Sequence, residues 1–289
     1  MPFHPDESIR LHDGRQVCGT HQLVVCPSCC VDYSFMDEMS DPELDEESDG
    51  ESDGVAEVVG RMMGGLELRI GSGRVIPEKF IPPRETDTPQ SLFPPGIGTK
   101  AIPPVHRFIR RNNKAEILIY TDGACLDNGR ENPRGGSAFV FKPSTSTVRG
   151  HVAFRLENEG PTGQQHQQTS NRAELRAVIG ALRFRAWPGE GFKTIVIATD
   201  SEYIVNGATD FVRSWLQNGW KRGSGAAVKN KDLWQTLLGE IERWFDEDLK
   251  IKFWRIPREW NTEADRWAKD VAANESCPEK FSTISGVLV

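Results

Sequence analysis

Apolar runs and amphipathic stretches follow one another regularly only in the second half of the chain, from about residue 112. Continuous apolar runs predict buried strands, and a spacing of three or four predicts helices. The predicted strands cover 116–125, 136–142, 148–154, 193–200 and 250–256. The predicted helices cover 171–186, 201–217, 230–246 and 261–272. This order predicts an α/β domain over residues 112–275 with a tail at 276–289.

The preceding residues lack such a pattern. A short leader with Cys and His covers residues 1–36, and residues 37–54 hold ten acids without Lys or Arg. Pro and Gly punctuate the chain from 61 to 104, where we expect one short strand at 67–70. We therefore predict an acidic and then Pro/Gly-rich linker over 37–111, mostly disordered.

The charge distribution changes what the composition implies about partners. The whole chain of 289 residues carries a formal charge of -7, but without the ten acids of residues 37–54 the remainder carries +3. Binding to phosphates depends on the local field of a domain. Overall acidity therefore does not exclude a nucleic-acid partner.

Six cysteines and the N-terminal residues bear on the compartment. The start MPFHPDESIR lacks the apolar region of a signal peptide, and no stretch has the roughly 18 apolar residues of a membrane span. We expect reduced cysteines in a nuclear or cytoplasmic protein that is not secreted. We also expect a monomer with no membrane partner.

Four acids lie where a purely structural role is hard to assign. Asp122 interrupts an apolar strand and Asp200 ends another, while Glu174 and Asp265 are in the first turns of helices. Strand ends and helix starts that meet at one sheet edge would bring the four together. Clustered carboxylates repel one another unless cations neutralise them, and Mg²⁺ prefers oxygen ligands. The acids are thus candidates for a metal site.

Each acid also has an ordinary explanation. Asn171 and Glu174 have the spacing of a capping box, and Asp200 could cap the next helix. Asp265 could be a solvated acid that favours the helix dipole. Asp122 is the least easily explained in this way. The spacing of these residues alone does not indicate a nuclease.

Five sequence blocks, in order, resemble type 1 ribonuclease H over residues 114–274. They are YTDGAC (120–125), TSNRAEL (169–175), ATDSEYIVNG (198–207), NGWKRGSGAAVKNKDLW (218–234) and NTEADRWA (261–268). The resemblance implies an α/β ribonuclease H-like fold, a five-stranded mixed sheet flanked by helices. It also implies two Mg²⁺ or Mn²⁺ ions and a catalytic, metal-binding quartet. That quartet is Asp122, Glu174, Asp200 and Asp265.

The resemblance further implies contacts with an RNA–DNA hybrid. The matching positions are Asn128, Thr169, Asn171, Tyr203, Trp215, Trp220, Lys221 and Asn230. Core packing is the alternative for the tryptophans and is our preference for Trp234 and Trp244; a solvated face is the alternative for Lys221. The family often has an Arg where this chain has Gln167. The usual His before the last Asp is absent, so Arg258 or Glu259 would have to substitute.

The leader offers a separate set of metal ligands. Cys18, His21, Cys26 and Cys29 form two close pairs that suit tetrahedral Zn²⁺, and Cys30 could replace Cys29. The alternative is a reduced, unstructured leader without metal. This stretch also resembles a Cys-rich leader of fungal proteins, while the N-terminal hybrid-binding domain of many eukaryotic ribonucleases H is not recognisable.

Our leading hypothesis is an endonuclease that hydrolyses the RNA strand of RNA–DNA hybrids with two metal ions. One alternative is a non-catalytic hybrid-binding module, which only the missing His supports. Another is a relative with this fold and a different role, such as an exonuclease or a transposon-derived domain. The predicted basic protrusion after Asn218 argues against an exonuclease.

Overall fold

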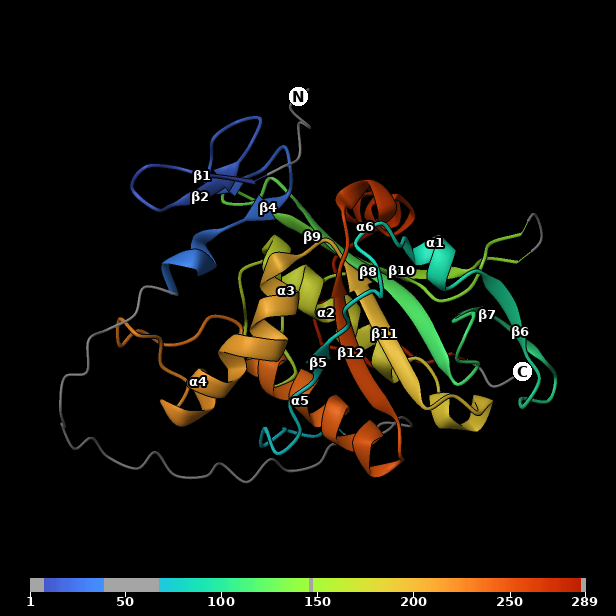
Figure 1. The fold of residues 1–289 in the computed structure, drawn as a ribbon. Coiled ribbons are helices and arrows are strands. Elements are labelled where there is room, and N and C mark those ends of the chain that lie inside the picture. The colour runs from blue at the N-terminus through green and yellow to red at the C-terminus, as the bar shows by residue number, and fades with distance from the viewer. Residues whose placement is uncertain (1–7, 39–67, 146–147, 287–289) are drawn as a thin grey trace.

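A mixed sheet of eight strands lies at the centre of the computed structural model, which describes residues 8–38, 68–145 and 148–286 (Figure 1). Six strands follow the order β10-β9-β8-β11-β12-β5, and β7 pairs with both β6 and β8. The strands are β5 (Glu78–Lys79), β6 (Pro95–Gly98), β7 (Val105–Ile109), β8 (Glu116–Leu126), β9 (Arg134–Val140), β10 (His151–Arg155), β11 (Thr194–Thr199) and β12 (Lys250–Arg255). The predicted ribonuclease H-like arrangement of sheet and helices is confirmed.

Helices form at the four predicted stretches, and one further short helix forms within the segment predicted to be a linker. They are α1 (Pro89–Leu92), α2 (Ser170–Arg183), α3 (Glu202–Asn206), α4 (Val212–Gln217), α5 (Lys231–Asp246) and α6 (Thr262–Asn274). A π-helical turn, Gly207–Phe211, joins α3 to α4. Short 3₁₀ turns occupy Ser34–Glu38, Trp187–Glu190 and Arg258–Trp260. No helix in the described ranges is long and apolar enough to cross a membrane.

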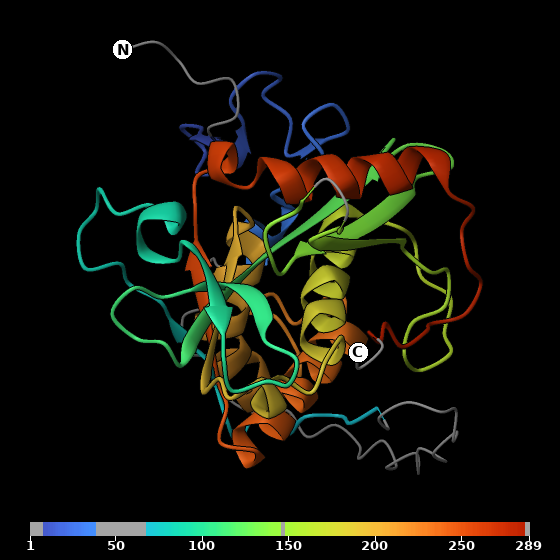
Figure 2. The same cartoon turned by 90° about the vertical axis from the view of Figure 1, so that its right-hand side faces the viewer.

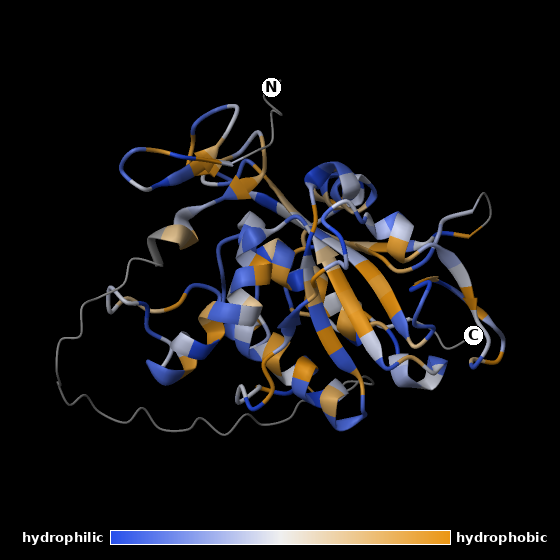
Figure 3. Ribbon diagram, in the orientation of Figure 1, coloured by the Kyte–Doolittle hydropathy of each residue, from blue (hydrophilic) through white to orange (hydrophobic). Residues whose placement is uncertain are grey.

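Both faces of the central strands are buried, which explains their continuous apolar runs. Along β8, Ile117 and Ile119 belong to the core under α2 and α5, whereas Leu118 and Tyr120 belong to the core on the opposite face. Figure 3 shows the resulting apolar colour along the central strands. Figure 2 shows α6 lying across β8, β9 and β10. The acids are therefore exceptions in an apolar frame.

The prediction of a disordered linker is wrong for residues 68–111. This segment adds β5, β6 and β7 to the sheet, and β7 pairs with β8 in the register Ile109↔Ile117. Phe80 and Phe93 are buried against Trp254, with ring centroids 4.8 and 6.3 Å from it. Burial of these apolar side chains on the sheet outweighs the local preference of a Pro-rich chain for irregular structure.

The strand predicted at 67–70 is also absent from its described part, 68–70. The next residue, Gly71, donates its N–H to the Gln235 carbonyl at 2.8 Å, and a Cβ on it would come within 2.3 Å of the Gly239 nitrogen. The chain here packs on a helix instead of pairing in a sheet. The rest of the predicted linker, 39–67, lies outside the described residues.

The leader forms two small antiparallel pairs above one end of the sheet (Figure 1, blue). Its strands are β1 (Ser8–Arg10), β2 (Gln16–Cys18), β3 (Val25–Cys26) and β4 (Val31–Asp32). Strands of two or three residues bury too little surface to be stable alone. Their stability must come from contacts with the domain or from a bound metal.

Candidate active site

The sheet and helices bring all four predicted acids to one cleft. Asp122 is in β8, Asp200 directly follows the parallel neighbour β11, and their strands pair in the register Ala198↔Tyr120. Glu174 is in the first turns of α2, and Asp265 is in the first turn of α6. The four side chains line the same pocket. The predicted convergence at one sheet edge is confirmed.

The structure removes the local explanations for two of these acids. The N-cap of α2 is Thr169, whose side chain accepts from the Arg172 N–H, so Asn171 and Glu174 form no capping box. The cap of α3 is Ser201, whose hydroxyl accepts from Ile204, so Asp200 does not cap that helix. Neither carboxylate is therefore used as a helix cap.

Burial and mutual repulsion dominate the electrostatics of the cleft. Burial raises the pKa of Asp122 well above its usual range, and the nearby Asp200 and Asp265 raise it further. Burial followed by the charges of Asp122 and Asp200 does the same to the pKa of Glu174. Among the described residues, no donor reaches the buried Glu174 Oε2. A buried, unpartnered carboxylate oxygen in an acidic cluster suits a cation.

Asn261 holds one of the acids in place. We expect it to cap the last helix, but its side chain makes no cap hydrogen bond and turns inward. Its Nδ2 donates to Asp200 Oδ1 at 2.6 Å and to the Thr121 carbonyl at 3.0 Å. Asn261 is 1% exposed, so its amide fixes the position of Asp200 relative to β8.

Two cations flank the fourth acid. Arg258 Nη2 lies 3.0 Å from Asp265 Oδ1, and Lys269 Nζ lies 2.8 Å from the same oxygen. Of the two residues suggested to replace the missing loop His, Arg258 contacts the acid cluster, whereas Glu259 is exposed. Lys269 was overlooked, although its spacing of four residues from Asp265 on a helix was a usable signal.

The polar residues predicted to contact a hybrid are partly engaged within the protein. Asn128 donates to the Ser170 hydroxyl at 2.9 Å, and Asn171 donates to the Asp32 carbonyl at 3.2 Å. Thr169 and Asn230 both occupy N-cap positions, of α2 and α5. They lie at the ends of helices beside the cleft, and we keep their phosphate contacts as a prediction.

The predicted aromatic contacts lie in the core. Tyr203, Trp215 and Trp220 are 3, 4 and 9% exposed. The Tyr203 hydroxyl accepts from Trp234 Nε1 at 2.8 Å, and the Trp215 and Trp234 rings lie 5.3 Å apart. Packing accounts for these rings as observed, and it also accounts for Trp234 and Trp244, both 1% exposed, as predicted.

The predicted basic protrusion joins α4 to α5 and carries exposed cations. Lys221, Lys229 and Lys231 are exposed, and Arg222 is half-buried. Trp220 has a φ of 64°, which turns the chain out of α4 toward this segment. Exposed lysines of this kind supply contacts with phosphates in nucleic-acid-binding proteins.

The leader brings its four predicted metal ligands together. Ligand atoms of Cys18, His21, Cys26 and Cys29 all lie within 4.8 Å of one another. His21 Nδ1 is 3.3 Å from the Cys29 sulfur and 3.4 Å from the Cys26 sulfur. Tetrahedral Zn²⁺ places nitrogen and sulfur ligands about 3.6 Å apart, from its usual bond lengths. The residues present therefore fit a zinc ion.

Two features of the cluster resemble thiolate sites. The His21 N–H donates to the Cys18 sulfur at 3.3 Å, and the Cys29 N–H donates to the Cys26 sulfur at 3.4 Å. Two sulfur atoms of the proposed ligand set therefore each face a backbone N–H group. Cys30 does not join the set, because its thiol donates to the Pro27 carbonyl at 3.6 Å.

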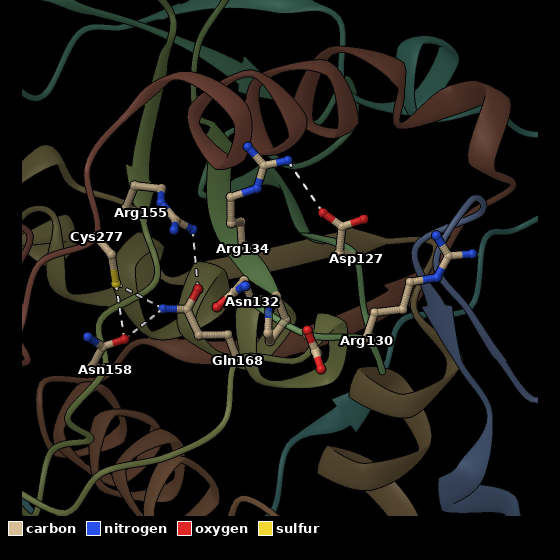
Figure 4. A pocket seen from close by; sticks show the side chains of 10 residues that line it. Asp127, Arg130, Asn132, Arg134, Arg155, Asn158, Gln168 and Cys277 are labelled. Carbon is tan, nitrogen blue, oxygen red and sulfur yellow. Dashed lines mark hydrogen bonds and ion pairs between the residues drawn. The ribbon is translucent and has the colours of Figure 1, made fainter.

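A wider hollow elsewhere on the domain has a volume of about 710 Å³ (Figure 4). Its polar side chains already pair with one another: Gln168 Nε2 donates to Asn158 Oδ1 at 3.0 Å, and its Oε1 accepts from Arg155 at 3.2 Å. The lone Cys277 sulfur accepts from the same Gln168 amide at 2.9 Å. The hollow thus has a structural network and no cluster of acids comparable to the cleft.

Comparison with known proteins agrees with the geometry of the cleft. The sequence model of the RNase H family matches residues 114–273. Ribonuclease H of Treponema pallidum is 40% identical over 128 residues, 44% of this chain and 73% of that protein. Human ribonuclease H1 is 32% identical over 174 residues, 59% of this chain and 54% of that protein.

A solved structure, LC9-RNase H1, described as a type 1 RNase H with the type 2 active-site motif, is 30% identical. The likeness covers 56% of this chain and 74% of that chain, with a TM-score of 0.40. The matched relatives are named ribonuclease H, which disfavours the alternative of a non-catalytic module. The family match over more than half of the chain, together with relatives named ribonuclease H, shows that this protein belongs to the RNase H family and is a type 1 ribonuclease H.

Proposed function

We propose that this ribonuclease H hydrolyses the RNA strand of RNA–DNA hybrids internally, with two Mg²⁺ or Mn²⁺ ions held at the acidic cleft. The observation that carries the proposal is the convergence of four carboxylates, two of them buried with raised pKa, in one pocket. Water would attack phosphorus, the bond from phosphorus to O3′ would break, and O3′ would take up a proton. The products have 3′-hydroxyl and 5′-phosphate ends.

The carboxylates would hold the ions. Asp122, at the centre of the cluster, would contribute to both sites, Glu174 to one of them, and Asp265 would complete the second with Asp200. Oxygen-only donors are the set that Mg²⁺ prefers. When bound, such ions neutralise charge that develops on the phosphate and activate water.

The protein's own groups position the acids and the substrate. The Asn261 amide holds Asp200, and Arg258 and Lys269 hold Asp265, so neither acid must be ordered when substrate binds. Preorganised groups of this kind lower the reaction barrier because no reorganisation is needed. Lys221 on the protrusion would bind the DNA strand electrostatically.

Other hybrid contacts would come from polar groups beside the cleft. Thr169 and Asn230 would meet a DNA phosphate, while Asn128 and Asn171 would contact the minor groove. Contacts with 2′-hydroxyls distinguish RNA from DNA. Tyr203, Trp215 and Trp220 would act mainly by supporting this face, since their rings are buried.

The test is cleavage of an end-labelled hybrid, duplex DNA and duplex RNA with Mg²⁺. We expect internal cuts only in the RNA of the hybrid, and loss of cleavage in Asp200→Asn with an unchanged circular dichroism spectrum. Asp270→Asn, an exposed position on the same helix as Asp265, is the control and should cleave normally. Cleavage by Asp200→Asn would contradict the assignment.

We also propose that the leader binds one structural Zn²⁺ through Cys18, His21, Cys26 and Cys29. The close approach of the four ligand atoms supports this proposal. Metal analysis of the purified protein should find one zinc per chain, lost in Cys26→Ser and kept in Cys277→Ser. Zinc-free wild-type protein, purified without chelator, would refute it.

A further inference from the structure

The leader contacts the catalytic domain on the face that contains the acidic cleft (Figure 1). The Phe35 and Tyr203 ring centroids lie 5.3 Å apart, and Phe35 is 3% exposed. The Asp32 carbonyl accepts from Asn171 Nδ2 at 3.2 Å. A Cβ built on Gly129 would lie 3.3 Å from a methyl group of leader residue Val25. Apolar and polar contacts thus join the leader to three separate parts of this face.

Further bonds extend this interface on both sides. Gln16 Nε2 donates to Glu202 Oε2 at 3.0 Å, and Lys229 Nζ donates to the Ser34 hydroxyl at 3.0 Å. The Cys29 carbonyl accepts from Arg258 Nη1 at 3.1 Å, and Arg258 also pairs with the catalytic Asp265. The guanidinium of Arg258 therefore connects the loop of proposed zinc ligands directly to Asp265.

The leader also narrows the cleft itself. Five leader residues line the same pocket as the four acids: Cys30, Val31, Asp32, Tyr33 and Phe35. The cavity volume that remains is about 50 Å³. That is room for a few water molecules, since a buried water needs roughly 10–15 Å³ of such space. A sugar-phosphate strand is far larger than this space.

Residues on the face that the proposed function assigns to the hybrid are covered in this arrangement. Asn171 is 8% exposed and already donates to the leader, and Tyr203 is 3% exposed beneath Phe35. Lys229 is engaged by Ser34. The leader also places the acidic residue Asp32 in the lining of the cleft. The leader therefore covers the same surface that the hybrid would have to occupy.

We propose that the leader is an intramolecular occupant of the hybrid-binding face, and that hybrid binds only after the leader moves off it. The inference rests on the proposed function, because the competitor is the hybrid. Zinc bound by the leader would keep its small strands folded in both positions. The apparent dissociation constant then exceeds the intrinsic one by the inverse of the fraction of molecules with the face open.

The first test measures hybrid binding by fluorescence anisotropy in full-length protein carrying Asp200→Asn, which keeps the RNA intact. Adding Phe35→Ala removes the aromatic contact with Tyr203, and we expect the apparent Kd to fall about tenfold as the open fraction rises. Leu23→Ala, an exposed apolar position of the same leader, is the matched control and should leave the Kd unchanged.

A second measurement does not depend on the folding of a leader variant. Hydroxyl-radical labelling of Phe35 in the Asp200→Asn protein should increase when saturating hybrid is added, because the leader is displaced. Unchanged or reduced labelling would overturn the inference, since the leader would then remain in place or itself contact the hybrid. Equal or weaker binding by Phe35→Ala would overturn it as well.

These outcomes are separate from failure of the proposed function. If the protein binds hybrid but the leader stays in place, only the inference is wrong. If neither the Asp200→Asn protein nor its Phe35→Ala derivative binds hybrid at any concentration tested while both remain folded, the proposed function is contradicted. The proposed competition between leader and hybrid is then contradicted as well.

Discussion

Gly123, next to the proposed metal ligand Asp122, leaves no room for a side chain. A Cβ built there would lie 2.0 Å from the Glu174 nitrogen, 2.3 Å from the Ala173 carbonyl carbon and 2.6 Å from the Glu174 Cα. All three atoms belong to the backbone of α2, so no side chain can rotate away. Gly123→Ala should therefore push the start of α2 away from β8.

The size of the effect follows from these distances. Ordinary contact begins at 3.4 Å, so the nearest atom is 1.4 Å too close. Overpacking of this kind typically destabilises by about 1–3 kcal/mol. At about 2–4 °C per kcal/mol for a domain of this size, Tm should fall by roughly 2–12 °C. Because Glu174 moves with the helix, kcat/KM should fall about 100-fold, the usual result of an error of about 1 Å.

The assay combines thermal unfolding with initial rates of hybrid cleavage in Mg²⁺. Gly189→Ala is the control, because a Cβ there meets nothing within 4 Å and its φ is not positive. That variant should keep both Tm and rate. Wild-type stability and rate in Gly123→Ala would refute the close approach of β8 and α2, and with it the placement of Glu174 beside Asp122.

Two further predictions concern the acid cluster. Because the pKa values of Asp122 and Glu174 are raised, the folded state binds protons at these groups more tightly than the unfolded state does. Their contribution to the free energy of unfolding is therefore greatest below about pH 4, and it declines as the pH rises through the folded pKa. Urea unfolding without added Mg²⁺ should show a steeper decline from pH 4.5 to 7.5 in wild type than in Asp122→Asn, and parallel curves would contradict this. Asn261→Ala removes the hydrogen bonds to Asp200 and to the Thr121 carbonyl. The free energy of unfolding should therefore fall by about 1–3 kcal/mol, and hybrid cleavage should become at least tenfold slower. An unchanged cleavage rate would mean that Asp200 does not depend on Asn261 for its position.

The amino-acid sequence was sufficient to predict the main strands and helices of residues 112–275 and the four acids that meet in the cleft. The apolar runs at 116–125 and 193–200 could be predicted as strands because both faces of each strand are buried. Such burial leaves a short, continuous apolar run in the sequence. The five ordered blocks identified Asp122, Glu174, Asp200 and Asp265 through resemblance. Capping and charge patterns around single residues could not do this, because helix starts attract the same residue types for local reasons.

The packing of the folded domain determines which of the local explanations is correct. Thr169 caps α2 in place of Asn171, and Asn261 turns inward to Asp200 instead of capping α6. Residues 68–111 join the sheet although their Pro content predicts a linker. The Thr169 cap is a contact with the nearby Arg172. For Asn261 and for residues 68–111, the deciding contacts join residues distant in sequence, and their free energy is invisible to a local window.

The leader is the clearest example of this division. Its ligand spacing indicated a metal site from sequence alone, and the four ligand atoms do converge. That this small unit lies across the catalytic face, with Phe35 on Tyr203 and Cys29 on Arg258, follows from no sequence pattern. Spacing determines local chemistry, whereas the surface on which a segment packs depends on shape and charge that exist only after the domain has folded.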